Sequence, residues 1–194
     1  MTTDKPERKP NYHRIAVVGT TGSGKTTLAR RLAQLLAIPH VELDAIHWGP
    51  NWTPISPELF CERTTQALNG TSWTVDGNYS RVRDIIWSRA DTIVWLDYAL
   101  PVIMGRLITR TLRRSLTREN LWGGNRETLG KALFSRESIL LWALRTYRRR
   151  RREYPALLAR PEFAHLTLVR LCSPRETGNW LRHLEFHNPL NLEN

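Results

Sequence analysis

Gly19-Thr20-Thr21-Gly22-Ser23-Gly24-Lys25-Thr26-Thr27 is the stretch of sequence that decides the fold. It fits the pattern G-x-x-x-x-G-K-[ST], follows the apolar run Ile15–Val18 and opens a helical pattern that reaches Ala37. A strand, a glycine-rich turn and a helix in this order form a phosphate-binding loop, or P-loop. Its backbone N–H groups turn inward around phosphates, and the helix N-terminus adds partial positive charge. All nine residues are predicted to bind ATP, with Lys25 on the β- and γ-phosphates and Thr26 on Mg²⁺.

Around this loop, short apolar runs alternate with helical patterns along the whole chain. The runs predict strands at Arg14–Val18, His40–Leu43, Trp73–Val75, Thr92–Leu96 and Leu166–Leu171. Helices are expected at about 24–37, from the N-cap Ser56 to about 69, at 80–89, from Pro101, at 137–158 and at 174–184. This alternation predicts an α/β P-loop NTPase fold with a doubly wound, five-stranded parallel sheet flanked by helices.

The length of 194 residues suits a single domain. We expect a disordered tail at 1–12, the P-loop domain at 13–187 and a C-terminal tail at 188–194. Within the domain, the glycine- and arginine-rich region at about 115–150 is predicted to form a helical lid. The first 14 residues have no apolar segment, and no run of about 18 apolar residues occurs anywhere. These features predict a cytoplasmic protein without a membrane span.

The net charge of +11 favours anionic partners, which could be nucleotides, nucleic acid or an acidic membrane surface. Composition alone does not choose among them.

Cys61 and Cys172 lie far apart and lack the spacing of metal ligands, so neither a zinc site nor a disulfide framework is indicated. Cys172 lies in an apolar run and is expected in the core. The five arginines Arg148–Arg152 point in all directions on a helix. They predict a solvated helix end or, alternatively, a contact with nucleic acid or anionic lipid.

Several segments resemble known kinases. The N-K-x-D motif of GTPases and the LSGGQ motif of ABC ATPases do not occur in the sequence. Instead, from about Arg14 to Leu184 the chain resembles the nucleotide-kinase-like group, which includes adenylate, shikimate and gluconate kinases. Val75–Arg81 stands where adenylate kinases have L-D-G-F-P-R, and Ser173-Pro174-Arg175 resembles the loop that lines adenine. His40–Trp48, Val75–Tyr79 and Leu121–Glu127 together resemble bacterial topology modulation (FlaR-like) proteins.

The resemblance implies an ATP- and Mg²⁺-dependent kinase that phosphorylates a small molecule, with a nucleotide or nucleoside as the expected acceptor. Asn78-Tyr79 replaces Phe-Pro of adenylate kinases, which leaves the acceptor itself open. A monomer or homodimer is expected. Two alternatives stay open: a nucleic-acid-associated NTPase or polynucleotide kinase (a DNA topology modulator), and a regulator that only senses nucleotide.

Three aspartates follow predicted strands. Asp44 is a candidate for accepting a proton from the acceptor hydroxyl or for orienting Mg²⁺, and it could equally cap the next loop. The resemblance implies that Asp76 holds Mg²⁺ through water, although an Asp-Gly turn would explain it as well. Asp97 is expected to cap a helix rather than bind metal.

The remaining candidates surround these carboxylates. With Lys25 and Asp44, the expected catalytic residues are the lid arginines Arg110, Arg114 and Arg136; Arg118 and Arg126 are further lid candidates. Acceptor binding is predicted for Asp44, His47, Trp48, Asp76, Gly77, Asn78, Tyr79, Arg81 and Arg83. A guanidinium can bind a phosphate or carboxylate through two hydrogen bonds, whereas His47, Trp48 and Trp52 could also merely cover the core.

Overall fold

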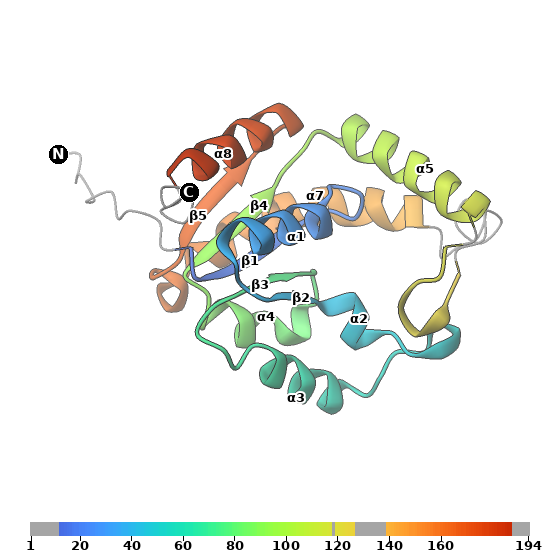
Figure 1. The fold of residues 1–194 in the computed structure, drawn as a ribbon, viewed down its shortest axis with the longest axis horizontal. Helices are drawn as coiled ribbons and strands as arrows, with labels where there is room; N and C mark the ends of the chain where they lie inside the picture. The colour runs from blue at the N-terminus through green and yellow to red at the C-terminus, as the bar shows by residue number, and fades with distance from the viewer. Residues whose placement is uncertain (1–11, 118, 127–138, 188–194) are drawn as a thin grey trace.

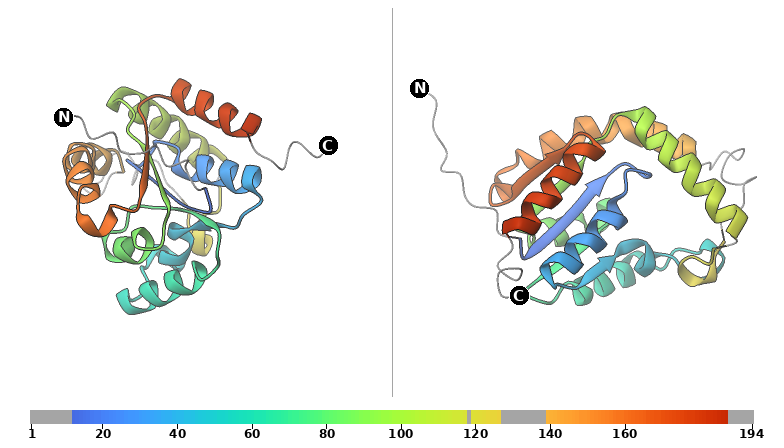
Figure 2. Two further views of the ribbon diagram at one scale, coloured as in Figure 1. Left: turned by 90° about the vertical axis from the view of Figure 1, so that its left-hand side faces the viewer. Right: turned by 45° about the horizontal axis from the view of Figure 1, so that its top comes forward.

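The computed structural model describes residues 12–117, 119–126 and 139–187. Within them, five parallel strands form one sheet in the order β2-β3-β1-β4-β5. The strands are β1 (Arg14–Gly19), β2 (His40–Glu42), β3 (Trp73–Asp76), β4 (Thr92–Leu96) and β5 (Thr167–Leu171). Helices lie on both faces of the sheet (Figures 1 and 2). The predicted α/β class and the doubly wound, five-stranded parallel sheet are confirmed.

The helices follow the strands along the chain. They are α1 (Lys25–Leu36), α2 (Leu43–His47), α3 (Pro57–Ala67), α4 (Ser80–Trp87), α5 (Leu100–Thr117), α7 (Ile139–Leu158) and α8 (Pro174–His187). Short 3-10 turns occur at η1 (Pro50–Trp52), η2 (Trp122–Gly124) and η3 (Pro161–Phe163). Ser56 caps α3 as predicted, because its hydroxyl accepts a hydrogen bond of 3.2 Å from the N–H of Leu59.

Strand β4 shows why the sheet is buried on both faces. All of its residues are buried. Ile93 and Trp95 pack into a core that also contains residues of α2, α3, α4 and α7, whereas Val94 and Leu96 pack into one with residues of α1, α5 and α8. An uninterrupted apolar run is therefore what this strand requires. Each such side chain contributes roughly 1.5–3 kcal/mol on burial.

The end of β2 differs from the prediction. The strand stops at Glu42, and Leu43 begins α2, so Asp44 lies in the first turn of a helix rather than in a loop. Leu43 is 1% exposed and fills the space beside Gly77, where a Cβ would lie 2.7 Å from the Leu43 side chain. Gly77 has a φ of +144°, a conformation that L side chains rarely adopt. Packing between two distant segments thus ends the strand.

Two further residues differ from their predicted places. Asp97 does not cap a helix: its buried carboxylate pairs with Arg151 of α7 at 2.8 Å and with Arg170 of β5 at 2.5 Å. Cys172 is exposed rather than in the core. It directly follows Leu171, the buried last residue of β5, and therefore begins the turn into α8.

The strand order places the candidate site. β1 lies at the centre, and the chain builds β2 and β3 on one side of it before adding β4 and β5 on the other. In such sheets, ligands bind at the carboxyl ends of the strands where the order reverses. The P-loop follows β1 at that point.

The described helices include none that is both long enough and apolar enough to cross a membrane. The predicted tails, 1–12 and 188–194, lie outside the described residues except for Tyr12, whose ring packs edge-on against Trp180. The predicted lid region contains the end of α5, η2 and the first part of α7; residues 118 and 127–138 lie outside the described residues.

Candidate active site

The P-loop is shaped by glycines at positions that a side chain would block. Gly19, Gly22 and Gly24 have φ values of +148°, +83° and +95°. A Cβ on Gly19 would lie 2.6 Å from the carbonyl oxygen of Leu96, so the loop can pass directly over the end of β4. The N–H of Ser23 donates to the carbonyl of Thr20 at 3.0 Å, which closes the turn before α1 begins. The result is the concave run of backbone N–H groups that the motif predicts.

Lys25 extends back over this loop. Its ammonium group donates to the carbonyl of Thr20 at 3.3 Å. The pKa of Lys25 is lowered to about 8, chiefly by burial and then by the positive charge of Arg150, while Asp76 and Asp44 act in the opposite direction. A bound polyphosphate would raise this pKa again, because its negative charge favours the protonated form of the lysine.

Asp76 lies at the end of β3, beside the P-loop helix. Its Oδ2 accepts a hydrogen bond of 2.6 Å from the hydroxyl of Thr26, and its Oδ1 lies 2.7 Å from Nε2 of His40. Both contacts fix the direction of the carboxylate. Hydroxyl and carboxylate oxygens are ligands that Mg²⁺ prefers, so Thr26 and Asp76 fit the metal that a P-loop requires. His40 was not predicted as a site residue.

Asp44, which also lines the site, is bound to Tyr79. The Tyr79 hydroxyl donates to Oδ1 of Asp44 at 2.5 Å. Burial raises the pKa of Tyr79, and the neighbouring Asp44 charge raises it further, so the phenol stays protonated as a donor. Asn78 binds the start of the P-loop through two hydrogen bonds, from the Gly19 N–H at 3.3 Å and to the Gly19 carbonyl. These contacts hold the segment predicted to bind the acceptor against the loop predicted to bind the donor.

A cleft of about 1300 Å³ opens between the P-loop, α5, η2 and the start of α8. Thr21 to Thr27, Asp44 and Asp76 line it. So do Arg110 and Arg114, two of the three arginines predicted to act on phosphate. The third, Arg136, lies outside the described residues, as does Arg118; Arg126 is exposed and donates to Asn120.

Arg106 is a cleft residue that sequence reasoning did not select. Its guanidinium donates to the carbonyl of Ser23 at 3.0 Å and lies 5.1 Å from the centre of the Tyr98 ring. Arg106 thus lies directly over the P-loop turn. The four arginines of α5 look alike in sequence, and only the packing of Tyr98 distinguishes this one.

Only one residue of the loop predicted to line adenine lies in the cleft. Pro174 lines the cleft, together with Thr177, Gly178 and Leu181 of the same helix. Ser173 instead caps α8, accepting a hydrogen bond of 3.1 Å from the N–H of Glu176, and Arg175 is exposed. Ser173 and Arg175 are not among the residues that line this cleft.

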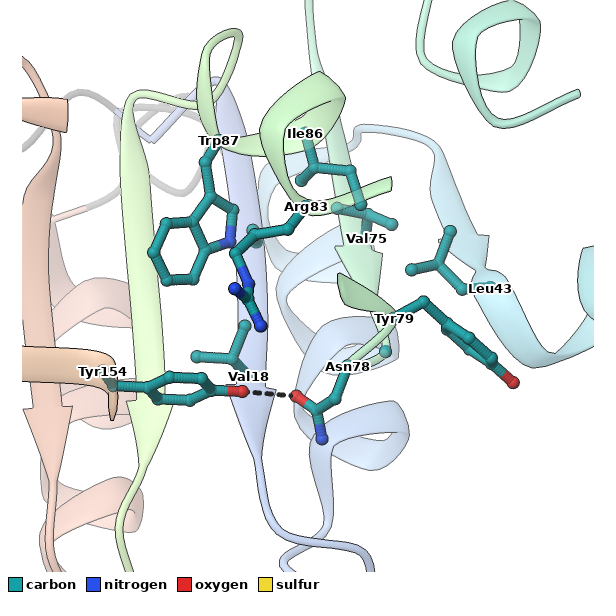
Figure 3. A pocket seen from close by; sticks show the side chains of 11 residues that line it. Val18, Leu43, Val75, Asn78, Tyr79, Arg83, Ile86, Trp87 and Tyr154 are labelled. Carbon is teal, nitrogen blue, oxygen red and sulfur yellow. Dashed lines mark hydrogen bonds between the residues drawn. The ribbon is translucent and has the colours of Figure 1, made fainter. Parts of the chain in front are cut away.

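The residues predicted to bind the acceptor lie in different places rather than in one pocket. Gly77, Asn78, Tyr79 and Arg83 line a second, small cavity of about 20 Å³ behind the P-loop (Figure 3). Arg81 is exposed in the first turn of α4. His47 and Trp48 lie in an aromatic cluster with Phe60 and Tyr79, with ring centres 4.5–4.9 Å apart around His47. Burial lowers the pKa of His47, partly offset by the charge of Asp44.

A contact that we call the latch joins η2 to the loop of η1, which lie side by side in the molecule (Figures 1 and 2). Asn125, only 6% exposed, donates to the carbonyls of Gly49 at 2.8 Å and Trp122 at 2.6 Å, and accepts from the N–H of Trp52 at 2.8 Å. Gly123 lies against the backbone of Gly49. The latch therefore closes one side of the large cleft.

No protein-family model matches this sequence, and no curated protein matches it. Solved structures do match. A shikimate kinase from Acinetobacter baumannii in complex with shikimate has 15% identity and a TM-score of 0.52, with 95% of this chain and 96% of that chain covered. A shikimate kinase from Bacteroides thetaiotaomicron has 13% identity and a TM-score of 0.51, with 90% and 97% covered. A gluconokinase from Sinorhizobium meliloti 1021 has 18% identity and a TM-score of 0.49, with 96% of this chain and 100% of that chain covered.

The chain thus has the fold of P-loop kinases. The similarity at this level of identity establishes the fold. The more specific resemblances, to adenylate kinases and to topology modulation proteins, remain predictions from the motifs.

Proposed function

We propose that this protein transfers the γ-phosphoryl group of ATP to a hydroxyl group of a small acceptor. The observation that carries the proposal is the arrangement at the carboxyl ends of the strands. Lys25 and Thr26 of a complete P-loop line the cleft, with Thr26 bound to Asp76, and Asp44, bound to Tyr79, lines the same cleft. Phosphoryl transfer needs little more than positioning and charge neutralisation, and this arrangement supplies both.

Each side chain has a proposed task. Lys25 and the N–H groups of the loop bind the β- and γ-phosphates, and Thr26 with Asp76 would hold Mg²⁺, which supplies positive charge to the phosphates. Arg110 and Arg114 reach the cleft from α5 and neutralise phosphate charge. Tyr79 occupies Oδ1 of Asp44, so Oδ2 is the atom we assign to accept the proton of the acceptor hydroxyl.

The nucleobase has a proposed place beside the P-loop. Arg106 and Tyr98 on one side and Pro174, Thr177 and Gly178 on the other line that part of the cleft. A planar cation such as the Arg106 guanidinium stacks well on aromatic rings. We assign this surface to the base of ATP, and the region near Asp44 and Tyr79 to the acceptor. A nucleotide or nucleoside remains the acceptor that the motifs favour, and the cytoplasm the expected location.

The test is phosphoryl transfer from labelled ATP to a panel of nucleosides, nucleotides and small hydroxy acids, with magnesium present. We expect transfer to at least one acceptor, and a loss of about 10³-fold or more in kcat for Lys25→Ala. The matched control is Arg63→Ala, an exposed cation of α3 far from the loop in sequence. Undiminished turnover in Lys25→Ala, or ATP binding without transfer to any acceptor, would refute the proposal and favour a protein that only senses nucleotide.

A further inference from the structure

Helix α7 turns one of its five consecutive arginines into the protein. Arg150 is 7% exposed, whereas Arg148, Arg149, Arg151 and Arg152 are exposed. Its only hydrogen bond within the described part of the chain is a long one, 3.4 Å from Nη1 to the hydroxyl of Thr146. Its neighbour Arg151 pairs with Asp97, and Glu153, one turn away, pairs with Arg149.

A buried guanidinium without a carboxylate is costly. Transfer of a charge out of water is compensated only by a counter-ion or by several good hydrogen bonds. Among the described residues Arg150 forms no ion pair. The cost is the reason to expect that an anion occupies the space beside it when the enzyme works.

The surroundings of Arg150 show where that space is. Burial lowers the pKa of Arg150, and among the charges that lower it further is Arg83 of α4. The charge of Arg150 in turn lowers the pKa of Lys25. Arg150 and Tyr154 are one turn apart and lie on the same face of α7, and Tyr154 lines the small cavity together with Arg83 of α4.

Tyr154 fixes the position of this part of α7. It lies one turn after Arg150, and its hydroxyl donates to Oδ1 of Asn78 at 3.0 Å. In Figure 3 the guanidinium of Arg83 extends from α4 toward Asn78 and the Tyr154 hydroxyl, in the small cavity behind the P-loop. The cavity of about 20 Å³ accommodates one group the size of a water molecule. An oxygen atom of an anion fits there, while the rest of the ligand would extend toward Tyr79 and Asp44.

We propose that Arg150 and Arg83 bind an oxyanion carried by the phosphoryl acceptor, either a carboxylate or a phosphate ester. The inference rests on the proposed function and narrows its substrate class to anionic hydroxy compounds. Two guanidinium groups offer paired N–H donors that match the oxygens of either group. A neutral acceptor would leave both cations uncompensated, so the site also selects against it.

The experiment compares matched acceptors that differ only in charge: glycerol with glycerate and glycerol phosphate, glucose with gluconate and glucose 6-phosphate, and adenosine with AMP. Within the set that is phosphorylated, we expect kcat/KM for the anionic member to exceed that for the neutral one by about 100-fold. The comparison of carboxylate with phosphate identifies the anion.

Arg150→Gln and Arg83→Gln should each lower kcat/KM for the anionic acceptor by at least tenfold, with the affinity for ATP changed less than threefold. Their controls, Arg148→Gln of α7 and Arg63→Gln of α3, remove exposed arginines and should change neither value. Arg150→Lys keeps a cation if the glutamine variant fails to fold, and it should retain part of the preference. Preference for the neutral acceptor would overturn the inference. So would an Arg150→Gln variant that loses ATP affinity and keeps its acceptor preference.

A binding measurement separates this inference from the proposed function. The same compounds are added to the protein with ADP and magnesium, and the unfolding temperature is recorded. Stabilisation by the anionic members alone, lost in Arg150→Gln, supports the site even if no phosphoryl transfer occurs. Equal stabilisation by neutral and anionic members, or none by either, contradicts it.

Discussion

Lys25 is partly buried where the polyphosphate is predicted to bind, and its charge is costly to the protein without that ligand. Burial, with help from Arg150, lowers its pKa from 10.5 to about 8. The folded protein therefore holds this proton less tightly than the unfolded chain does. At pH 7 the lysine is nevertheless mostly charged, so the fold bears the cost of burying it. Binding sites commonly sacrifice stability in this way.

We expect Lys25→Met to be more stable than the wild type at pH 7, by about 1–2 kcal/mol, while losing turnover. Between pH 8 and 10.5 the unfolded wild type binds more protons than the folded one, so wild-type stability rises with pH over this range relative to the variant. The advantage of the variant should therefore shrink from pH 7 to pH 10. Urea denaturation at both pH values measures it. A methionine variant less stable than the wild type at pH 7, when Arg63→Met is unchanged, would show that the lysine is not strained by burial.

Residues of the P-loop could be predicted from sequence because every signal lies within one short stretch: three glycines, a lysine and a threonine between a strand and a helix. His40 and Arg150 could not. His40 reaches Asp76 across 36 positions in the chain. Arg150 is the middle residue of five consecutive arginines, and nothing in the sequence distinguishes it from the other four. Only the packing of α7 against the rest of the protein turns its side chain inward.

At the scale of elements, the latch joins two segments that sequence analysis treated separately. Gly123 has a φ of +64°, and a Cβ there would lie 2.6 Å from the carbonyl carbon of Gly49. Gly124 has a similar φ of +75°, but a Cβ there meets nothing within 4 Å. The two glycines therefore form a matched pair in which only the first supports the contact.

We expect Gly123→Ala to separate η2 from the loop of η1 and to expose the cleft to water. ATP hydrolysis in the absence of acceptor should rise several-fold relative to phosphoryl transfer, because closure is what excludes water. Gly124→Ala carries the same backbone strain without the clash and should leave the ratio unchanged. Asn125→Ala, which removes three hydrogen bonds, should act like Gly123→Ala. Equal hydrolysis ratios in Gly123→Ala and Gly124→Ala would show that the latch does not control access of water.

A second contact between elements fastens α7 to the sheet. Asp97 follows β4 and is 4% exposed as a residue, and its two oxygens pair with Arg151 of α7 and Arg170 of β5. Removal of its charge leaves both arginines without this partner. We expect Asp97→Asn to lower the free energy of unfolding by about 1–3 kcal/mol. Glu162→Gln, which breaks an exposed pair with Arg160, should cost less than about 0.5 kcal/mol. Similar losses for both variants in urea would mean that Asp97 acts only as a surface charge.

These elements also show where prediction from sequence stops. The strands were recognised because each is a short apolar run, and all five start and end within one residue of the expected place. The ends of β2 and the role of Asp97 depend on side chains that arrive from elsewhere: Leu43 packs beside Gly77, and the arginines come from α7 and β5. Spacing within one segment contains no information about such partners.

At the scale of the whole molecule, the net charge of +11 serves more than one purpose. Arg106, Arg110 and Arg114 line the cleft, Arg150 is buried near Lys25, and Arg151 is paired with Asp97. Arg148 and Arg152 are exposed on α7 and belong to none of these sets. The arginines therefore fall into three groups: those at the candidate site, those that stabilise the fold and those on the outer surface. Separate variants can test each group.

The double variant Arg148→Gln/Arg152→Gln tests whether the outer surface takes part in function. We expect it to leave a duplex-DNA column at lower salt than the wild type, because each lost phosphate contact reduces the salt dependence of binding by about one unit of slope. Its phosphoryl transfer rate should not change, since neither residue lies in the cleft. Arg150→Gln should show the reverse: unchanged DNA elution, because the side chain is buried, and impaired transfer. If DNA instead stimulates ATP turnover in the wild type and the double variant loses that stimulation, the acceptor is nucleic acid and the outer arginines belong to the active surface. The two variants thus decide between a small-molecule kinase and a nucleic-acid-dependent enzyme, because they remove positive charge from opposite sides of one helix.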